Sequence, residues 1–305
     1  MISPDTIRNA FQGKMSLQHK LAPYTSMRVG GPADVFLEPK DREDLISVVR
    51  FLQENSYPFM MIGRGSNMIV HDEGIRGAVV YPEPGLSRVA LEGDLVVAEA
   101  GARLTKLVDF CVQNGLGGLE WAAGIPASVG GAIVMNAGAH GAEMKDSLVD
   151  ADVLRNRSVV RVPREEAGFG YRTSVFVHDV VLSGRFRLST VDRQEIIKRR
   201  SDLIARRNAT QPLNFPNSGS MFKNPPGTFA AKLIEQAGLK AKRVGGAQIS
   251  EKHANFMVNL GTAKADDVVR LIDLVRRTVY QNAGILLELE VKLIGFPEHV
   301  LEHVA

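Results

Sequence analysis

Residues 123–141, AGIPASVGGAIVMNAGAHG, constrain the fold of this 305-residue chain more than any other stretch. The segment holds five glycines and five alanines and almost no charge, which is unusual for a surface loop or a core helix. So much glycine permits positive φ angles and lets a large ligand approach the backbone closely. Ser128 and Asn136 stand among the small side chains. The segment therefore predicts a wall of backbone N–H groups that suits a pyrophosphate or a flat ring; a glycine-rich turn between two core strands is the alternative.

The composition narrows the class of protein. With 45% hydrophobic and 23% charged residues, the chain is typical of a soluble globular protein of two or three domains. The net charge of +3 suits small anionic ligands and is too weak to indicate nucleic acid. No apolar run approaches the roughly 18 residues of a membrane span, and the N-terminus lacks a signal-peptide pattern. We expect a cytoplasmic protein without membrane insertion.

Cysteine and histidine patterns argue against metal chemistry. Cys111 is the only cysteine, so the sequence predicts neither an intrachain disulfide nor a cysteine metal cluster. Residues 299–303, HVLEH, match an H-x-x-E-H zinc pattern, but they lie at the C-terminus, where nothing supplies a third ligand. No metal site is predicted.

A second glycine-rich turn follows a compact strand–helix–strand unit. Residues 33–38 and 59–62 predict strands, and Asp41 predicts the N-cap of a helix that runs to about residue 55. The unit leads into residues 63–67, GRGSN, whose successive N–H groups suit an anion. A dinucleotide fingerprint would need a glycine where Met68 stands, and no P-loop motif occurs, so a Rossmann site and a P-loop are disfavoured.

The rest of the chain alternates predicted helices and strands. Residues 191–207 predict a helix with a basic face, either solvated or attracting an anionic substrate. The closing strand would place Glu288 and Glu290 on one face, where an unpaired carboxylate among apolar residues is costly. The other predictions are strands at 78–81, 95–99, several within 151–185 and 285–294, and helices at 104–114, 229–237 and through Val268, Ile272, Val275 and Val279 to about Gly284.

The segments TSMRVGGPADVFLEP, GRGSN and AGIPASVGGAIVMNAGAHG together resemble the FAD-binding half of the UDP-N-acetylenolpyruvoylglucosamine reductases. The resemblance implies an α+β chain: an FAD-binding fold of the vanillyl-alcohol oxidase type in two α+β subdomains, 1–80 and 81–195, and an α+β substrate-binding domain, 205–305, whose last strand returns to the first subdomain. The first turn would hold the FAD pyrophosphate and the second would lie along the flavin. The implied FAD contacts are Gly63, Arg64, Gly65, Ser66, Asn67, Gly124, Pro126, Ser128, Gly130, Gly131, Asn136 and Gly138.

Further segments are similar to the family's active-site motifs. They are FGYR at 169–172, SGSMFKNP at 218–225, GGAQISEKHANFMVN at 245–259 and ELEV at 288–291. The resemblance assigns catalysis to Arg172, Ser220 and Glu290, with Ser220 as the proton donor. It assigns substrate contacts to Tyr171, Lys223 and Asn224. His253 is expected to be structural.

The reaction implied by the resemblance is reduction of the enolpyruvyl ether of UDP-N-acetylglucosamine to UDP-N-acetylmuramate, for peptidoglycan and hence cell-wall growth. NADPH would reduce a non-covalent FAD, whose N5 would pass hydride to C3 while Ser220 protonates C2. The segment between Arg172 and Ser220 is short and lacks the inserted lid of one subclass, so the chain resembles the shorter, lidless subclass. We also expect a monomer. His140 stands where the family often has tyrosine. The alternatives are another FAD-dependent oxidase of this fold and a non-redox nucleotide-sugar binding protein.

The two glycine-rich segments generate a first test, since neither suggests a residue that tethers flavin. The purified protein should be yellow, and denaturation should release free FAD into the supernatant, as measured by absorbance and fluorescence. Flavin that stays with the precipitate, or a colourless protein that takes up no FAD, would contradict the expectation.

Overall fold

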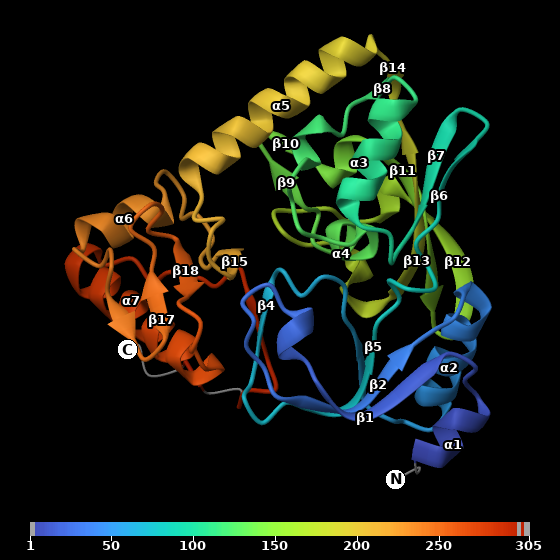
Figure 1. Cartoon of the computed structure of the whole chain (residues 1–305), viewed down its shortest axis with the longest axis horizontal. Helices are drawn as coiled ribbons and strands as arrows, with labels where there is room; N and C mark the ends of the chain where they lie inside the picture. Colours follow the sequence, from blue (N-terminus) through green and yellow to red (C-terminus); the bar gives the residue numbers. More distant parts are fainter. Residues whose placement is uncertain (1–3, 298–299, 302–305) are drawn as a thin grey trace. The chain divides into compact units, whose positions relative to one another are not determined.

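The structure, a computed structural model, describes residues 4–297, 300 and 301 (Figure 1). Residue contacts divide the chain into two units. Unit 1 comprises the described residues of Met1–Leu17, Val35–Arg64 and Gly77–Arg207. Unit 2 comprises Gln18–Asp34, Gly65–Arg76 and the described residues of Asn208–Ala305. The three-part division at 1–80, 81–195 and 205–305 stays a prediction.

Residues 4–80 contribute a four-stranded sheet with strand order β1-β2-β5-β3 and two α-helices. The predicted helix is confirmed, and Asp41 caps it by accepting a hydrogen bond from the Asp44 amide. The apolar face of that helix packs with Val35, Leu37 and Val80 of the strands in one core. The elements are α1 (Pro4–Asn9), β1 (Lys14–Lys20), β2 (Pro32–Glu38), α2 (Arg42–Glu54), β3 (Phe59–Met61) and β5 (Ile75–Val80).

Unit 1 continues in a five-stranded antiparallel sheet with strand order β12-β11-β13-β7-β6. The strands predicted at 95–99 and within 151–185 and the helix at 104–114 are confirmed. Strand β6 was not predicted, because it is short and carries exposed residues such as Leu91 (46% exposed). The elements are β6 (Val89–Glu92), β7 (Leu95–Glu99), α3 (Leu104–Gln113), α4 (Val129–Val134), β11 (Leu148–Arg155), β12 (Ser158–Pro163) and β13 (Val180–Arg187).

Short elements connect these layers. Two two-stranded ladders join β8 to β14 and β9 to β10. The elements are η1 (Ala22–Tyr24), β8 (Leu116–Gly117), η2 (Glu120–Ala122), β9 (Gly138–Ala139), β10 (Ala142–Glu143), η3 (Met144–Asp146), η4 (Arg164–Glu166), η5 (Val175–His178) and β14 (Ser189–Thr190).

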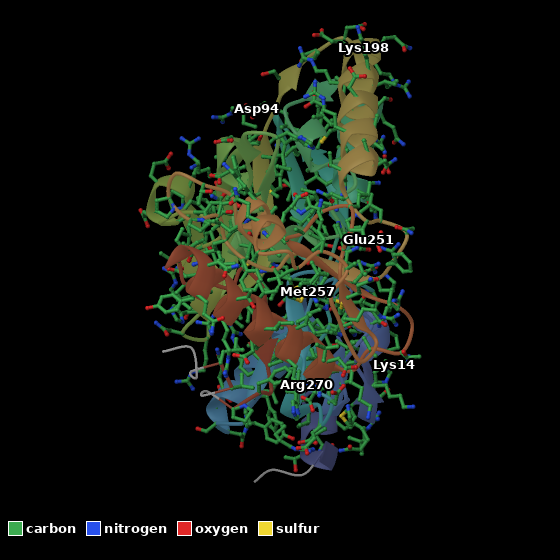
Figure 2. All side chains as sticks on the ribbon, turned by 90° about the vertical axis from the view of Figure 1, so that its left-hand side faces the viewer. Lys14, Asp94, Lys198, Glu251, Met257 and Arg270 are labelled. Atoms are coloured by element: carbon green, nitrogen blue, oxygen red, sulfur yellow. The ribbon has the colours of Figure 1, made fainter. Side chains whose placement is uncertain are left out.

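Helix α5 (Arg193–Thr210) is the predicted basic helix. Ile196 is its one buried residue, and side chains surround the helix near Lys198 in Figure 2. Some of its cations are paired, for example Arg200 with Asp109 at 2.7 Å. This pattern supports the solvated interpretation, because a helix with one buried residue and surface ion pairs is typical of a solvent-exposed element.

Unit 2 holds a four-stranded antiparallel sheet with strand order β15-β18-β17-β16, two helices and a parallel pair of strands. Met257 on β18, labelled in Figure 2, is 1% exposed and belongs to the core that the sheet shares with α7. The elements are β4 (Met68–Val70), β15 (Asn217–Ser220), α6 (Ala230–Gln236), β16 (Arg243–Val244), β17 (Ala247–Ile249), β18 (Phe256–Asn259), α7 (Ala265–Ala283) and β19 (Lys292–Ile294).

The prediction of a closing strand over 285–294 is wrong for most of its length. Only β19 forms there, and it pairs in parallel with β4. Residues 288–290 instead bond to a loop: the Glu288 carbonyl accepts from the Lys223 amide, and the Glu290 amide donates to the Met221 carbonyl. These bonds flank an isolated antiparallel bridge between Phe222 and Leu289, so the segment pairs at that position and does not continue as a strand.

Among the described residues, no helix combines the length and the apolar character needed to cross a membrane.

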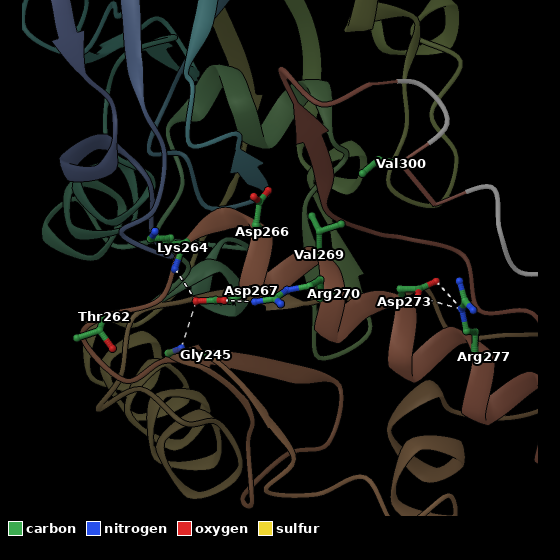
Figure 3. Close-up of a pocket in the computed structure, with 11 residues that line it drawn as sticks. Gly245, Thr262, Lys264, Asp266, Asp267, Val269, Arg270, Asp273, Arg277 and Val300 are labelled. Atoms are coloured by element: carbon green, nitrogen blue, oxygen red, sulfur yellow. Dashed lines mark hydrogen bonds and ion pairs between the residues drawn. The ribbon is translucent and has the colours of Figure 1, made fainter.

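Asp267, in the first turn of α7, ties that helix to the sheet of unit 2. Its Oδ2 accepts from the amides of Lys264 (3.0 Å) and Gly246 (3.2 Å). Its Oδ1 lies 2.7 Å from an Arg270 guanidinium nitrogen, and Figure 3 shows the carboxylate between Lys264 and Arg270. Burial would raise the pKa of the Asp267 carboxyl, but these hydrogen bonds outweigh it and lower that pKa below 3.8.

We expect Asp267→Asn to lower the free energy of unfolding by about 1 kcal/mol at pH 7, because the charged acceptor of the helix cap is lost. The lowered pKa means that the stabilisation is present above the ordinary carboxyl pKa of 3.8 and is lost as pH falls through the folded value. Urea unfolding at pH 7 and near pH 3 measures this. The control is Asp273→Asn, which breaks only an exposed pair with Arg277. Equal losses in both variants at pH 7 would rule out the cap.

Candidate active site

The glycine-rich segment 123–141 contains the short helix α4, whose first amides are bonded within the protein. The amides of Val129 and Gly130 donate to the carbonyls of Ala102 and Ala100, both at 2.8 Å. The Gly131 amide donates to Ser128 Oγ at 3.2 Å. The predicted wall of ligand-facing N–H groups is therefore wrong for these three amides. The alternative of a simple turn between two core strands is also wrong, because residues 129–134 of the segment form helix α4.

Two glycines in this region permit close packing of backbone segments. A Cβ on Gly130 would lie 2.9 Å from the Cβ of Ala100, and a Cβ on Gly63 would lie 2.2 Å from Ser128 Oγ. Such distances leave no room for a side chain. Within unit 1 the start of the GRGSN turn thus lies against the glycine-rich segment. The two stretches that the sequence assigns to one ligand are neighbours here.

Arg64 belongs to a cluster of charged groups that the sequence did not predict. Its Nη1 lies 3.1 Å from Glu83 Oε2, which also accepts from the Tyr81 hydroxyl at 2.6 Å. Arg103 Nε donates to Glu83 Oε1 at 2.6 Å. The only sequence signal is that Glu83 stands in a PEPG turn directly after a buried strand.

The cluster shifts the protonation of both its oxygen acids. Burial would raise the pKa of the Glu83 carboxyl, but the hydrogen bonds from Tyr81, Arg103 and Arg64 outweigh it and lower that pKa. Burial, together with Glu83, raises the pKa of Tyr81 to about 12. Glu83 is thus a carboxylate at neutral pH and orients two guanidinium groups. The pocket beside it has a volume of 270 Å³ and is lined by Tyr81, Glu83, Pro84, Ser87, Arg103 and Lys106.

The remainder of the GRGSN turn lies in unit 2. Gly65 has a φ of +55°, and a Cβ there would lie 2.2 Å from the Tyr24 carbonyl oxygen. The side-chain Nδ2 of Asn67 donates to the backbone carbonyl of Glu290 at 3.1 Å. The predicted FAD-contact residue Asn67 and the predicted catalytic residue Glu290 are thus directly bonded.

Ser220 lies at the end of β15, after a bulge. Asn217 pairs with Val258 and Ser220 with Phe256, so two residues of β15 face one residue of β18. Gly219, at a φ of +75°, makes the bulge, and its amide bonds to Asn217 Oδ1 at 3.1 Å. A bulge re-aims the side chain that follows it. The half-buried Ser220 is therefore directed by Gly219.

The residues that follow Ser220 contact the 288–290 segment. Lys223 Nζ lies 3.3 Å from Glu288 Oε2, and both side chains are exposed. Asn224 Oδ1 accepts from the Ala230 amide at 3.1 Å, at the start of α6. The structure thus brings Ser220, Lys223, Asn224 and Glu290 together in one region of unit 2. The hypothesis that Lys223 supports Ser220 as an acid stays a prediction.

The buried Asn255 supports the same loop. Its side chain exchanges hydrogen bonds with the backbone of Phe222, donating at 2.8 Å and accepting at 3.0 Å. The residue is 3% exposed. Sequence reasoning missed it, although a polar residue in the apolar run ANFMV was a signal.

Arg172 lies in unit 1, in a tight turn closed by Gly170 and Thr173. Its φ is +57°, and its Nη2 donates to the Gly138 carbonyl at 3.0 Å. The guanidinium lies 5.0 Å from the centre of the Tyr171 ring, and Tyr171 is 48% exposed. This arrangement fixes a cation beside an accessible aromatic ring. Tyr171, Arg172 and Gly138 are therefore brought together.

The remaining residues singled out in the sequence lie in loops and turns. Pro126 lies between η2 and α4. Gly124 lies against Arg207, whose Cδ would be 3.3 Å from a Cβ there. His140 is exposed, with a φ of +57°, in the turn between β9 and β10. Ser66 follows Gly65 in the turn.

His253 packs edge-on against Phe256, and burial lowers the pKa of its ring, in line with the structural role that we predicted.

Neither a metal-ligand cluster nor a further pocket marks a second site among the described residues. Within the described residues, no three His, Cys, Asp or Glu side chains gather as metal ligands, and His299, Glu302 and His303 of the H-x-x-E-H pattern lie outside those residues. A pocket of 820 Å³ in unit 2, shown in Figure 3, is lined by charged residues of α7. None of the predicted site residues lines it.

The chain matches two protein families and close relatives. Residues 33–161 match the family model of an FAD binding domain, and residues 211–294 match that of the C-terminal domain of UDP-N-acetylenolpyruvoylglucosamine reductase. The UDP-N-acetylenolpyruvoylglucosamine reductase of Chloroherpeton thalassium is 45% identical, over 98% of this chain and 99% of that protein. The one of Alkaliphilus oremlandii is 43% identical, over 93% and 94%. The crystal structure of the Thermus caldophilus reductase has a TM-score of 0.79 and 37% identity, and covers 93% of this chain and 99% of that one.

The surroundings of Gly65 leave no room for a side chain. A Cβ there would meet the Tyr24 carbonyl. We expect even Gly65→Ala to destabilise the protein by more than the roughly 1 kcal/mol that a positive φ costs. Gly238→Ala is the matched control, because Gly238 has a φ of +69° and open space around it. Thermal unfolding compares the two; equal shifts in Tm would mean that the Tyr24 contact is unimportant.

Proposed function

Because the chain belongs to the UDP-N-acetylenolpyruvoylglucosamine reductase family, we propose that it reduces UDP-N-acetylenolpyruvoylglucosamine to UDP-N-acetylmuramate with FAD and NADPH. The family and the α+β FAD-binding fold that the sequence predicts are confirmed. The observation that carries the proposal is 45% identity over nearly the whole chain to a reductase of this name. The grouping of Ser220, Lys223, Asn224 and Glu290 in unit 2 supports it.

The described residues fit an FAD site. Gly63 lies against Ser128, which brings the start of the GRGSN turn beside the other glycine-rich segment. Arg64, oriented by Glu83, offers a guanidinium for a pyrophosphate. We assign FAD contacts to both glycine-rich segments, because they are neighbours here and residues 33–161 match the family model of an FAD binding domain. When bound, FAD supplies the hydride chemistry.

Arg172 is proposed to stabilise the charge that develops on the substrate carboxylate. Hydride addition to an unsaturated carboxylate places negative charge on the carboxylate oxygens, and a fixed cation there favours the transition state over the bound substrate. Arg172 Nη2 donates to the Gly138 carbonyl, and this hydrogen bond fixes the orientation of the planar guanidinium group. Tyr171, exposed beside it, is a proposed substrate contact.

Ser220 is proposed to protonate C2 of the substrate. The bulge at Gly219 sets the direction of its hydroxyl. Glu290, whose backbone amide donates to the Met221 carbonyl next to Ser220, is the third catalytic residue that we propose. Lys223 and Asn224 are proposed substrate contacts. Small-molecule substrates, action as a monomer and a cytoplasmic location complete the proposal.

Ser220→Ala separates the two half-reactions. Reduction of the flavin by NADPH needs no acid from the protein, whereas the reduced substrate must gain a proton at C2. Stopped-flow absorbance should therefore show near-normal bleaching by NADPH and a reoxidation by substrate that is slower by about 10²–10⁴-fold, as for loss of a positioned general acid.

The exposed Ser201, on α5, supplies the control variant Ser201→Ala, which should leave both half-reactions unchanged. Equal slowing of both half-reactions by Ser220→Ala would remove the proton-donor role. A wild-type protein whose reduced flavin is not reoxidised by UDP-N-acetylenolpyruvoylglucosamine would remove the proposed function itself.

A further inference from the structure

Both the nitrogen and the oxygen of the Asn136 side-chain amide are hydrogen-bonded within the protein. The residue is 0% exposed, and its φ is +41°. Its Nδ2 donates to Glu143 Oε2 and to the Gly170 carbonyl, both at 3.0 Å. Its Oδ1 accepts from the Lys145 amide at 3.1 Å. A primary amide has two N–H donors, and both are occupied here. The side chain therefore has no donor left for a cofactor, to which the sequence assigned it.

Of the three groups that bond to the Asn136 side chain, the Gly170 carbonyl links it to Arg172. This carbonyl belongs to the turn that carries Arg172. The same oxygen also accepts from the Thr173 amide at 3.4 Å, and the Gly170 amide returns a bond to Thr173 at 3.1 Å. Asn136 thus holds the turn from outside, two residues before Arg172.

A second bond holds the other side of the turn. Ser174, 4% exposed, donates from Oγ to the Val134 carbonyl at 2.8 Å. Val134 is the last residue of α4, where carbonyls have no partner within the helix. Residues 134–136 therefore hold the chain on both sides of Arg172, at Gly170 and at Ser174.

The backbone of Arg172 needs such support. A non-glycine residue at a φ of +57° is strained and persists only where its surroundings fix it. Its guanidinium is held by the Gly138 carbonyl, two residues after Asn136. Main chain and side chain of Arg172 are thus both fixed by residues 134–138.

We propose that Asn136 is a positioning residue for Arg172, acting through the Gly170 carbonyl, and not a ligand of the cofactor. The catalytic role of Arg172 rests on the proposed function. The hydrogen bond by which Asn136 holds the turn of Arg172 does not depend on that function. Asn136 suits the task, because asparagine tolerates the left-handed conformation better than other side-chain-bearing residues.

The test is Asn136→Asp, which keeps the size, the tolerance of positive φ and the acceptor for Lys145, and removes both donors. A buried carboxylate would face the Gly170 carbonyl and Glu143, so the turn should shift. We expect FAD content and flavin reduction by NADPH to stay within about twofold of the wild type. Reoxidation by substrate should fall about 10²-fold, the loss expected for a misplacement of about 1 Å at a reacting centre.

The matched control is Asn114→Asp. Asn114 also donates from Nδ2 to a backbone carbonyl, that of Phe110 at 2.8 Å, but it is an exposed helix cap. Both half-reactions should be unchanged in this variant.

A double variant tests whether Asn136 acts through Arg172. If it does, Asn136→Asp combined with Arg172→Lys should reoxidise no more slowly than Arg172→Lys alone, because residues that act as one unit are not additive. Additive losses, loss of FAD, or equal slowing of both half-reactions in Asn136→Asp would overturn the proposal.

Amide hydrogen exchange tests whether Asn136 holds the turn at Gly170, and it needs no measurement of enzyme activity. In Asn136→Asp the amides of Gly170 and Thr173 should exchange at least tenfold faster, while that of Ala132 within α4 should not change. Unchanged exchange at Gly170 and Thr173 would overturn the positioning role even if the protein proves to be the proposed reductase. If the wild type shows no reductase activity, the proposed function fails, and accelerated exchange still supports the contact.

Discussion

The hydrogen bonds that anchor the start of α4 are the contacts on which unit 1 depends. The amides of Val129 and Gly130 bond to the carbonyls of Ala102 and Ala100, in the loop that follows β7. This is possible only because position 130 has no side chain to collide with Ala100. Once α4 is fixed against the sheet, its end presents the Val134 carbonyl and Asn136, which hold the turn of Arg172. A packing requirement in the core thus sets the position of a charged side chain at the surface.

Unit 2 achieves a similar result by a different device. A left-handed glycine before Ser220 makes a bulge, and the loop that follows pairs with residues 288–290. An antiparallel bridge joins Phe222 to Leu289, and backbone bonds from Lys223 to Glu288 and from Glu290 to Met221 flank it. The bulge and this bridge together hold the backbone on both sides of Met221.

The sequence predicted most elements because their local signals agree with the fold. Asp41 caps α2, Gly284 ends α7 in a left-handed conformation, and the apolar spacing of both helices matches their buried faces. The failures have a common physical cause. The strand at 285–294 and the N–H wall at α4 were inferred from composition, whereas the outcome depended on distant partners: the Met221 carbonyl in one case, and the Ala100 and Ala102 carbonyls in the other. Glu83 and Asn255 were missed because single polar residues give no periodic signal.

The discontinuous path of unit 2 has a consequence for how the protein is made. Asn67 bonds to Glu290, 223 residues further along the chain, and β4 finds its only ladder partner among the described residues in β19. At the usual rate of synthesis, on the order of 5–20 residues per second, the ribosome needs roughly ten seconds or more to supply those partners after Asn67 has emerged. During that interval the apolar residues Ile69 and Val70 of β4, which are buried in the finished protein, lack their partner strand β19. The residues of unit 1, which end at Arg207, can pack earlier. Strand β4 therefore stays unpaired in the nascent chain until residues 292–294 have been made.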